Sequence, residues 1–160
     1  MPEEQNRYIS DFLSDYLVTP TKSSINNLKL KKYNKKIFNF GDVMYDSILF
    51  YKKFINKVYS DNFKRKYNLK KNYVFLTIHR DINSDQKTIK KILKQISILN
   101  FLFFWPIHPK IEKIIKRNKL KLPSNIILSK PISYLDTICS IKESSFVVTD
   151  SGGVQKEAYF

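Results

Sequence analysis

The sequence predicts an α/β protein built around a mainly parallel sheet. Short apolar runs, rich in β-branched and aromatic residues, alternate along the 160 residues with longer segments whose apolar residues recur at helical spacing. Glycine or proline stands at several of the boundaries, and polar side chains follow the ends of several apolar runs. Strands that alternate with helices in this way favour a parallel sheet with helices on both faces.

The first part of the chain shows this alternation on a small scale. Tyr8, Ile9 and Phe12 form a helical stripe, and the apolar run that follows it ends at Pro20. The elements predicted here are helices over 3–14, 21–32 and 43–57, and strands over 16–18 and 37–40. The next segment, 59–72, is charged and poorly periodic, so we interpret it as a linker between two domains.

After this segment the apolar pattern becomes denser. We predict strands over 73–79, 101–105, 125–128 and 146–149, with helices that start at Ser84, cover 110–119 and start at Ser133. Ser133 and Asp136 have the spacing of a capping box, with Asp in place of Glu. Ligands of parallel sheets bind at the carboxyl ends of the strands. Polar residues are therefore expected to gather there.

Both histidines of the chain lie at such positions, His79 with Arg80 after the first of these four strands and His108 after the second. The fourth strand stops at Asp150 and continues through 151–153 (Ser-Gly-Gly) into a helix. A helix that opens on glycines presents unpaired N–H groups and the positive end of its dipole, which suits phosphate. We expect the glycines to allow close backbone approach or a positive φ.

Metal and disulfide chemistry find little support in the sequence. Cys139 is the only cysteine and lies in an apolar pattern, so we interpret it as a reduced core thiol rather than a nucleophile. With two histidines and no carboxylate at ligand spacing from them, no metal site is expected. No cofactor is expected either.

The net charge of +15 raises the question of nucleic acid. The lysines are scattered along predicted helices and loops, and no RNA-binding, zinc-finger or recognition-helix signature accompanies them. We therefore expect solvated lysine faces and no specific nucleic acid. The apolar runs are too short to cross a membrane, and the first residues lack the pattern of a signal peptide, so a cytoplasmic protein is expected.

Several segments, in order along the chain, resemble the UDP-N-acetylglucosamine 2-epimerase family. They are 77–80 (Thr-Ile-His-Arg), 106–109 (Pro-Ile-His-Pro), 131–134 (Pro-Ile-Ser-Tyr) and 149–158 (Thr-Asp-Ser-Gly-Gly-Val-Gln-Lys-Glu-Ala). The start of the chain, 1–7 (Met-Pro-Glu-Glu-Gln-Asn-Arg) with Asp11, resembles the family's Pro-Glu-Glu-x-Asn-Arg segment, and 41–46 (Gly-Asp-Val-Met-Tyr-Asp) resembles its interdomain segment. The matches cover nearly the whole chain.

The resemblance implies two Rossmann-like domains in a glycosyltransferase B-type arrangement, with a UDP-sugar held between them. In the family the Pro-Glu-Glu segment lies late in the first domain. Residues 1–58 are thus expected to be the tail of that domain with the interdomain segment, 59–72 the linker, and 73–160 a UDP-binding domain truncated at its C-terminus. The chain is expected to be an incomplete epimerase, inactive alone, whose full-length relatives are homodimers.

The family's reaction inverts C2 of a UDP-sugar by eliminating UDP and adding it back, a step in polysaccharide biosynthesis. The resemblance assigns catalytic roles to Glu3 and His79. It assigns substrate binding to Arg7, Arg80, His108, Asp150, Ser151, Gly152, Gly153 and Glu157, with Glu157 accepting from ribose hydroxyls. One departure lies after Arg80, where Ile82 stands in place of the family's usual Glu, although Asn83 is kept.

Three functions remain open on these residues. The first is the epimerase, in which two segments resemble the branch acting on UDP-2,3-diacetamido-glucuronate. The second is a related glycosyltransferase, which would lack the Pro-Glu-Glu-x-Asn-Arg segment. The third is a nucleotide-sugar binding fragment, or a basic nucleic-acid binder, without catalysis.

Overall fold

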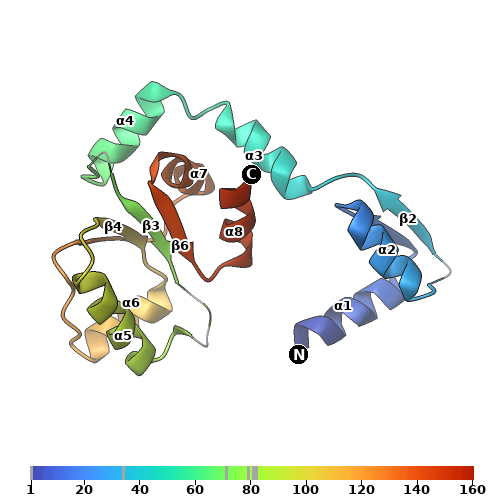
Figure 1. Cartoon of the computed structure of the whole chain (residues 1–160), viewed down its shortest axis with the longest axis horizontal. Coiled ribbons are helices and arrows are strands. Elements are labelled where there is room, and N and C mark those ends of the chain that lie inside the picture. The colour runs from blue at the N-terminus through green and yellow to red at the C-terminus, as the bar shows by residue number, and fades with distance from the viewer. Residues whose placement is uncertain (1, 34, 71, 79, 81–82) are drawn as a thin grey trace. The chain divides into compact units, whose positions relative to one another are not determined.

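The computed structural model describes residues 2–33, 35–70, 72–78, 80 and 83–160 (Figure 1). The chain forms two compact units, Met1–Asp46 and Ser47–Phe160, which we call the first unit and the sheet unit. The division falls within helix α3 (Val43–Lys52). In the part of the chain that is described, no helix is long and apolar enough to cross a membrane.

The first unit is a small β–α–β arrangement preceded by a helix. Its elements are α1 (Pro2–Leu13), β1 (Tyr16–Thr19), α2 (Lys22–Leu30) and β2 (Lys36–Asn39). The two strands are parallel, with Leu17 opposite Ile37. Thr21 starts α2, because its hydroxyl accepts a hydrogen bond from the Ser24 backbone N–H at 3.1 Å. The helices expected over 3–14 and 21–32 and the two expected strands are therefore present, whereas the helix expected over 43–57 ends at Lys52.

The sheet unit holds a four-stranded parallel sheet in the order β5-β4-β3-β6. Its remaining elements are α4 (Lys57–Lys66), β3 (Val74–Thr77), α5 (Gln86–Ser97), β4 (Phe103–Pro106), α6 (Pro109–Arg117), β5 (Ile126–Ser129), α7 (Tyr134–Glu143), β6 (Phe146–Thr149) and α8 (Gly152–Tyr159). The predicted parallel α/β fold is confirmed.

Helices cover both faces of this sheet, as expected. On one face, β-strand side chains such as Trp105, which is completely buried, pack in one cluster with α5 and α6. On the other face, Phe104 contacts the rings of Phe63 in α4 and of Tyr67 just after it. The hydroxyl of Tyr73 donates to the Ser140 carbonyl of α7 at 3.1 Å. Alternate residues of each strand thus feed two separate cores.

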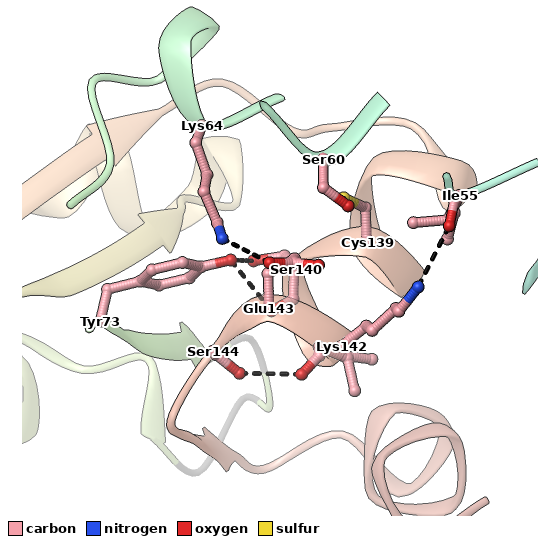
Figure 2. A network of polar contacts seen from close by, with 10 residues as sticks. Ile55, Ser60, Lys64, Tyr73, Cys139, Ser140, Lys142, Glu143 and Ser144 are labelled. Carbon is pink, nitrogen blue, oxygen red and sulfur yellow. Dashed lines mark hydrogen bonds and ion pairs between the residues drawn. The ribbon is translucent and has the colours of Figure 1, made fainter. Parts of the chain in front are cut away.

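Polar contacts fix α4 against α7 (Figure 2). Lys64 of α4 pairs with Glu143 of α7, and the Lys142 ammonium donates at 3.1 Å to the carbonyl of Ile55, just before α4. Cys139 is fully buried and lies 3.9 Å from the Ser60 hydroxyl, as a reduced thiol of the core. Burial raises the pKa of this thiol to about 11, which keeps it protonated and inert.

Two expectations about boundaries need correction. The segment 59–72, expected to be a linker, is largely helix α4 with Phe63 and Leu69 buried, so it belongs to the sheet unit, and the division between units lies at 46/47 instead of in 59–72. Its charges lie outside while a few apolar residues face the core. The helix expected from Ser84 begins two residues later, at Gln86, because Asp85 caps it through the N–H groups of Lys87 and Thr88.

Candidate functional site

The carboxyl ends of β3 and β6 are joined by a pair of threonines. Thr77 and Thr149 lie opposite each other in the parallel register, and their hydroxyl oxygens are 2.6 Å apart. The Thr149 hydroxyl also accepts a hydrogen bond from the Ser151 backbone N–H at 3.0 Å. This fixes the direction in which the chain leaves β6 and enters the next helix.

That helix is α8, which begins at the segment 151–153 that we call the glycine turn. Ser151 is the N-cap, and its hydroxyl accepts from the Val154 N–H at 3.4 Å. In the described part of the chain, no hydrogen bond occupies the N–H groups of Gly152 and Gly153. The start of α8 therefore offers two backbone donors and the positive end of a helix dipole.

Of the two reasons expected for a glycine at 152, a positive φ does not apply, and Gly41 (φ 83°) is the described glycine with a left-handed backbone. A Cβ added at Gly152 would meet only Nη2 of Arg80, at 3.9 Å, an ordinary contact distance. Glycine instead leaves open the space between the helix start and the Arg80 guanidinium.

Arg80 is held beside the glycine turn by Asp150. The Asp150 carboxylate accepts hydrogen bonds from the Arg80 backbone N–H at 3.0 Å and from the Asn83 amide at 3.1 Å. The Ser84 hydroxyl donates to the Arg80 carbonyl at 2.7 Å. A guanidinium next to unpaired helix N–H groups is an arrangement suited to binding an anion. This geometry supports a role for Asp150 in positioning the Arg80 guanidinium.

A crevice of about 300 Å³ lies at the same edge of the sheet, lined by residues from the ends of β3 and β4 and from α7 and α8. His108 is exposed in this lining and caps α6, since its Nδ1 accepts from the Lys110 N–H at 3.2 Å. Pro131 and Val154 line other parts of the wall. The crevice is mostly apolar, with His108 and two threonines as its polar groups.

Glu157 lies further along α8 and is only partly exposed. Burial raises the pKa of its carboxyl, and the hydrogen bond from the Tyr134 hydroxyl of α7 opposes that rise. The ring of Tyr134 in turn packs edge-on against Tyr51, with centroids 4.9 Å apart. The carboxyl of Glu157 thus lies beside Tyr134 of α7.

The structure brings together Arg80, Asp150 and the glycine turn. Glu3 and Arg7 belong to the first unit, where Glu3 is exposed on α1 and Arg7 pairs with Glu4. The catalytic role predicted for Glu3 and the substrate-binding role predicted for Arg7 stay predictions. His79 lies outside the described residues, so its predicted role is untested.

Sequence reasoning missed two features of this site. The threonine pair had a signal, because Thr77 and Thr149 both lie at or near the ends of predicted strands, but only the strand register shows that they are partners. The contact between Tyr134 and Glu157 joins separate helices and leaves no local pattern. Among the described residues, no three His, Cys, Asp or Glu side chains gather to hold a metal ion.

Comparison with known proteins relates this geometry to one family. The family model described as UDP-N-acetylglucosamine 2-epimerase matches residues 1–160. A UDP-N-acetylglucosamine 2-epimerase homolog of Methanococcus maripaludis is 41% identical over all of this chain and 46% of its own length. The UDP-2,3-diacetamido-2,3-dideoxy-D-glucuronate 2-epimerase of Pseudomonas aeruginosa is 38% identical over all of this chain and 45% of its own length.

Solved structures agree with the sequence relatives. The UDP-GlcNAc 2-epimerase of Methanocaldococcus jannaschii in complex with UDP-GlcNAc and UDP superposes with a TM-score of 0.81 at 33% identity, covering 99% of this chain and 46% of that one. The enzyme of Neisseria meningitidis bound to UDP-GlcNAc gives 0.80 at 25% identity, covering 98% and 45%. The expected relation to the glycosyltransferase B-type fold of these epimerases is confirmed.

The chain spans about half the length of the curated relatives it matches. Their similarity nevertheless extends from its first residues to its last, through both units. The family match and the shared fold show that the protein belongs to the UDP-N-acetylglucosamine 2-epimerase family.

Proposed function

We propose that the sheet unit binds the UDP part of a UDP-sugar, and that the whole protein containing it inverts C2 of that sugar by eliminating UDP and adding it back. The observation that carries this proposal is the Arg80 guanidinium beside the glycine turn. A diphosphate is an anion that gains negative charge as it leaves. Fixed donors aimed at that charge stabilise the transition state.

The other residues are assigned by what their positions allow. The crevice beside the turn, about 300 Å³ with a mostly apolar lining, suits a nucleoside. Glu157, which lies beside Tyr134 of α7, would accept from the ribose hydroxyls. Proton transfer at C2 needs carboxylates. Glu3 is the candidate in this chain, with Arg7 balancing charge and His79 acting near the departing diphosphate.

Because the chain spans about half of its relatives, their activity is a proposal for the longer protein. The cytoplasmic location and homodimeric state expected from the sequence belong to the same proposal. Within the family, the relative from Pseudomonas aeruginosa supports a UDP-diacetamido-glucuronate as the substrate. Competition between this sugar nucleotide and UDP-GlcNAc for the same protein would distinguish the two substrates.

The binding half of the proposal is tested by titration calorimetry with UDP. Gly152→Val places a branched side chain between the helix start and Arg80, so UDP affinity should fall by at least about tenfold, or 1.4 kcal/mol. Arg80→Gln should weaken binding in the same direction. Since a Cβ at Gly152 makes only an ordinary contact, the variant should remain folded.

The matched control is Ala158→Val, which adds the same side chain to an exposed position near the other end of α8. It should bind UDP as the unaltered protein does. Equal affinity for Gly152→Val and Ala158→Val would remove the glycine turn from the site.

A further inference from the structure

A basic groove lies on the α5 and α6 side of the sheet unit, formed by α5 and the segment 118–123 after α6. Its volume is about 620 Å³. Its floor contains Leu93 and Leu120, and its walls carry four exposed lysines, namely Lys90, Lys94, Lys119 and Lys121. We call it the lysine groove. None of the described lining residues is acidic or aromatic.

The lysine groove lies in the segment that carries most of the charge of the protein. Residues 86–130 contain eleven of the 29 basic residues but only one of the 14 acidic ones, Glu112. This segment, about a quarter of the chain, therefore supplies ten of the fifteen net positive charges. Basic residues are about as dense here as in residues 47–85, which hold nine in 39. The net charge is high because acidic residues are scarce in this segment, so its lysines have few carboxylates close in sequence.

The lysines of the groove have no counter-charge. Glu112 is already engaged, since its carboxylate pairs with Lys116 at 2.5 Å. Among the residues that the structure describes, none of the four groove lysines forms an ion pair. Lysines gathered without carboxylates repel each other, and an anionic partner would relieve that repulsion.

The shape and chemistry of the groove select among anionic partners. A single nucleic-acid strand is usually held by aromatic stacking, which no described lining residue offers. A membrane surface is planar, whereas this site is concave. Ammonium groups act as point charges on flexible stems, so they suit separate carboxylates, and the leucines of the floor suit apolar side chains between them.

We propose that the lysine groove is a docking site for an acidic segment of another protein, in which carboxylates alternate with apolar side chains. The carboxylates contact the lysines, and the apolar side chains cover Leu93 and Leu120. This site is separate from the glycine turn and does not depend on UDP binding. Because the attraction is electrostatic, binding weakens as salt rises.

The test is fluorescence anisotropy with a short labelled peptide in which glutamates alternate with leucines. The double variant K94E/K121E should bind this peptide at least about tenfold more weakly, since two attractive charges become repulsive. The control K53E/K70E makes the same change in net charge at two exposed lysines outside the groove. It should bind nearly as well as the unaltered protein. Circular dichroism and Trp105 fluorescence check that both variants are folded.

Two further probes make the outcome decisive. A peptide with serines in place of the leucines should bind more weakly, and an oligonucleotide of equal charge should not compete better than the original peptide. An equal loss of affinity in both double variants, or stronger competition by the oligonucleotide, would overturn the proposal. So would equal affinity for the serine peptide.

Discussion

The two units of this protein differ sharply in how well they bury their apolar residues. In the sheet unit, each face of the sheet has its own core, and Trp105 and Phe104 are completely buried. In the first unit, Leu17 and Thr19 are the buried residues among those described, while Phe12 and Leu13 are more than half exposed at 61% and 73%. The same chain thus contains one closed core and one apolar surface that α1 leaves open.

The two units carry the residues proposed for two different steps, nucleotide binding in the sheet unit and proton transfer in the first unit. The anion-binding site that we propose at Arg80 and the glycine turn is anchored to strands of the closed core. The candidate acid–base residue, Glu3, lies on α1, whose apolar side chains are exposed. Precise placement of reacting groups needs a rigid support. We therefore expect this chain to retain nucleotide binding and to lack epimerisation.

The largest difference between the two units is expected when a buried side chain is shortened to alanine. Trp105→Ala should lower the free energy of unfolding of the sheet unit by about 3–5 kcal/mol, because it leaves a large cavity in a closed core. Leu17→Ala should leave the unfolding of the sheet unit unchanged. Urea titrations check both variants, followed by circular dichroism for Trp105→Ala, which has no tryptophan left, and by Trp105 fluorescence for Leu17→Ala. A shift of the fluorescence midpoint in Leu17→Ala would show that the units unfold as one.

A smaller loss is expected when the polar contacts between α4 and α7 are cut. The buried Asp136 carboxylate accepts hydrogen bonds from the Tyr59 hydroxyl at 2.6 Å and from Lys66 at 3.1 Å. Asp136→Asn should lower the free energy of unfolding by about 1–3 kcal/mol, since the charge-assisted bonds are lost. Asp61→Asn, at an exposed position of α4, is the control and should change stability little.

The same carboxylate predicts a pH dependence. Burial would raise the pKa of Asp136, but the hydrogen bonds from Tyr59 and Lys66 and the charge of Lys66 outweigh burial and lower it. A carboxyl whose pKa is lowered by folding stabilises the fold when the pH is above its unfolded-state pKa of about 3.9. That stabilisation is lost as the pH falls below this value. The stability gap between the unaltered protein and Asp136→Asn should therefore shrink below about pH 4. A constant gap from pH 7 to pH 3 would contradict this assignment.

The smallest changes in stability are expected at two lysines that follow helices and have a left-handed backbone conformation. Lys32 after α2 (φ 54°) and Lys119 after α6 (φ 51°) both occupy a conformation that glycine adopts without strain. Lys119→Gly should stabilise the sheet unit by roughly 1 kcal/mol. Lys32→Gly should stabilise only the first unit, and amide hydrogen exchange in α2 should become slower. Destabilisation by Lys119→Gly would argue against the left-handed backbone there.

Much of the fold was predictable because its signals are local. Apolar runs and helical stripes located every strand and most helices, and Ser133 was recognised as a helix cap, which the 3.1 Å bond from the Asp136 N–H to its hydroxyl confirms. The sequence does not predict helix α4, because basic residues dominate the segment. Only Ser60 and Phe63 of this helix are buried, so it shows little apolar periodicity.

The candidate site was predictable to the extent that it follows strand ends. Arg80, Asp150 and the glycine turn were identified from their places after apolar runs. The bond between Asp150 and the Arg80 backbone depends on strand order, and the gathering of lysines depends on how α5 and α6 pack. Contacts between segments far apart in sequence leave no local pattern, so they required the structure.

The central claim is that this chain binds UDP in its sheet unit without moving the C2 proton. Proton NMR of UDP-GlcNAc in deuterated water with the 160-residue protein tests both parts in one sample. We predict saturation transfer from the protein to the uracil and ribose protons, with no deuterium at C2. Absence of saturation transfer, or loss of the C2 proton signal with time, would contradict the account.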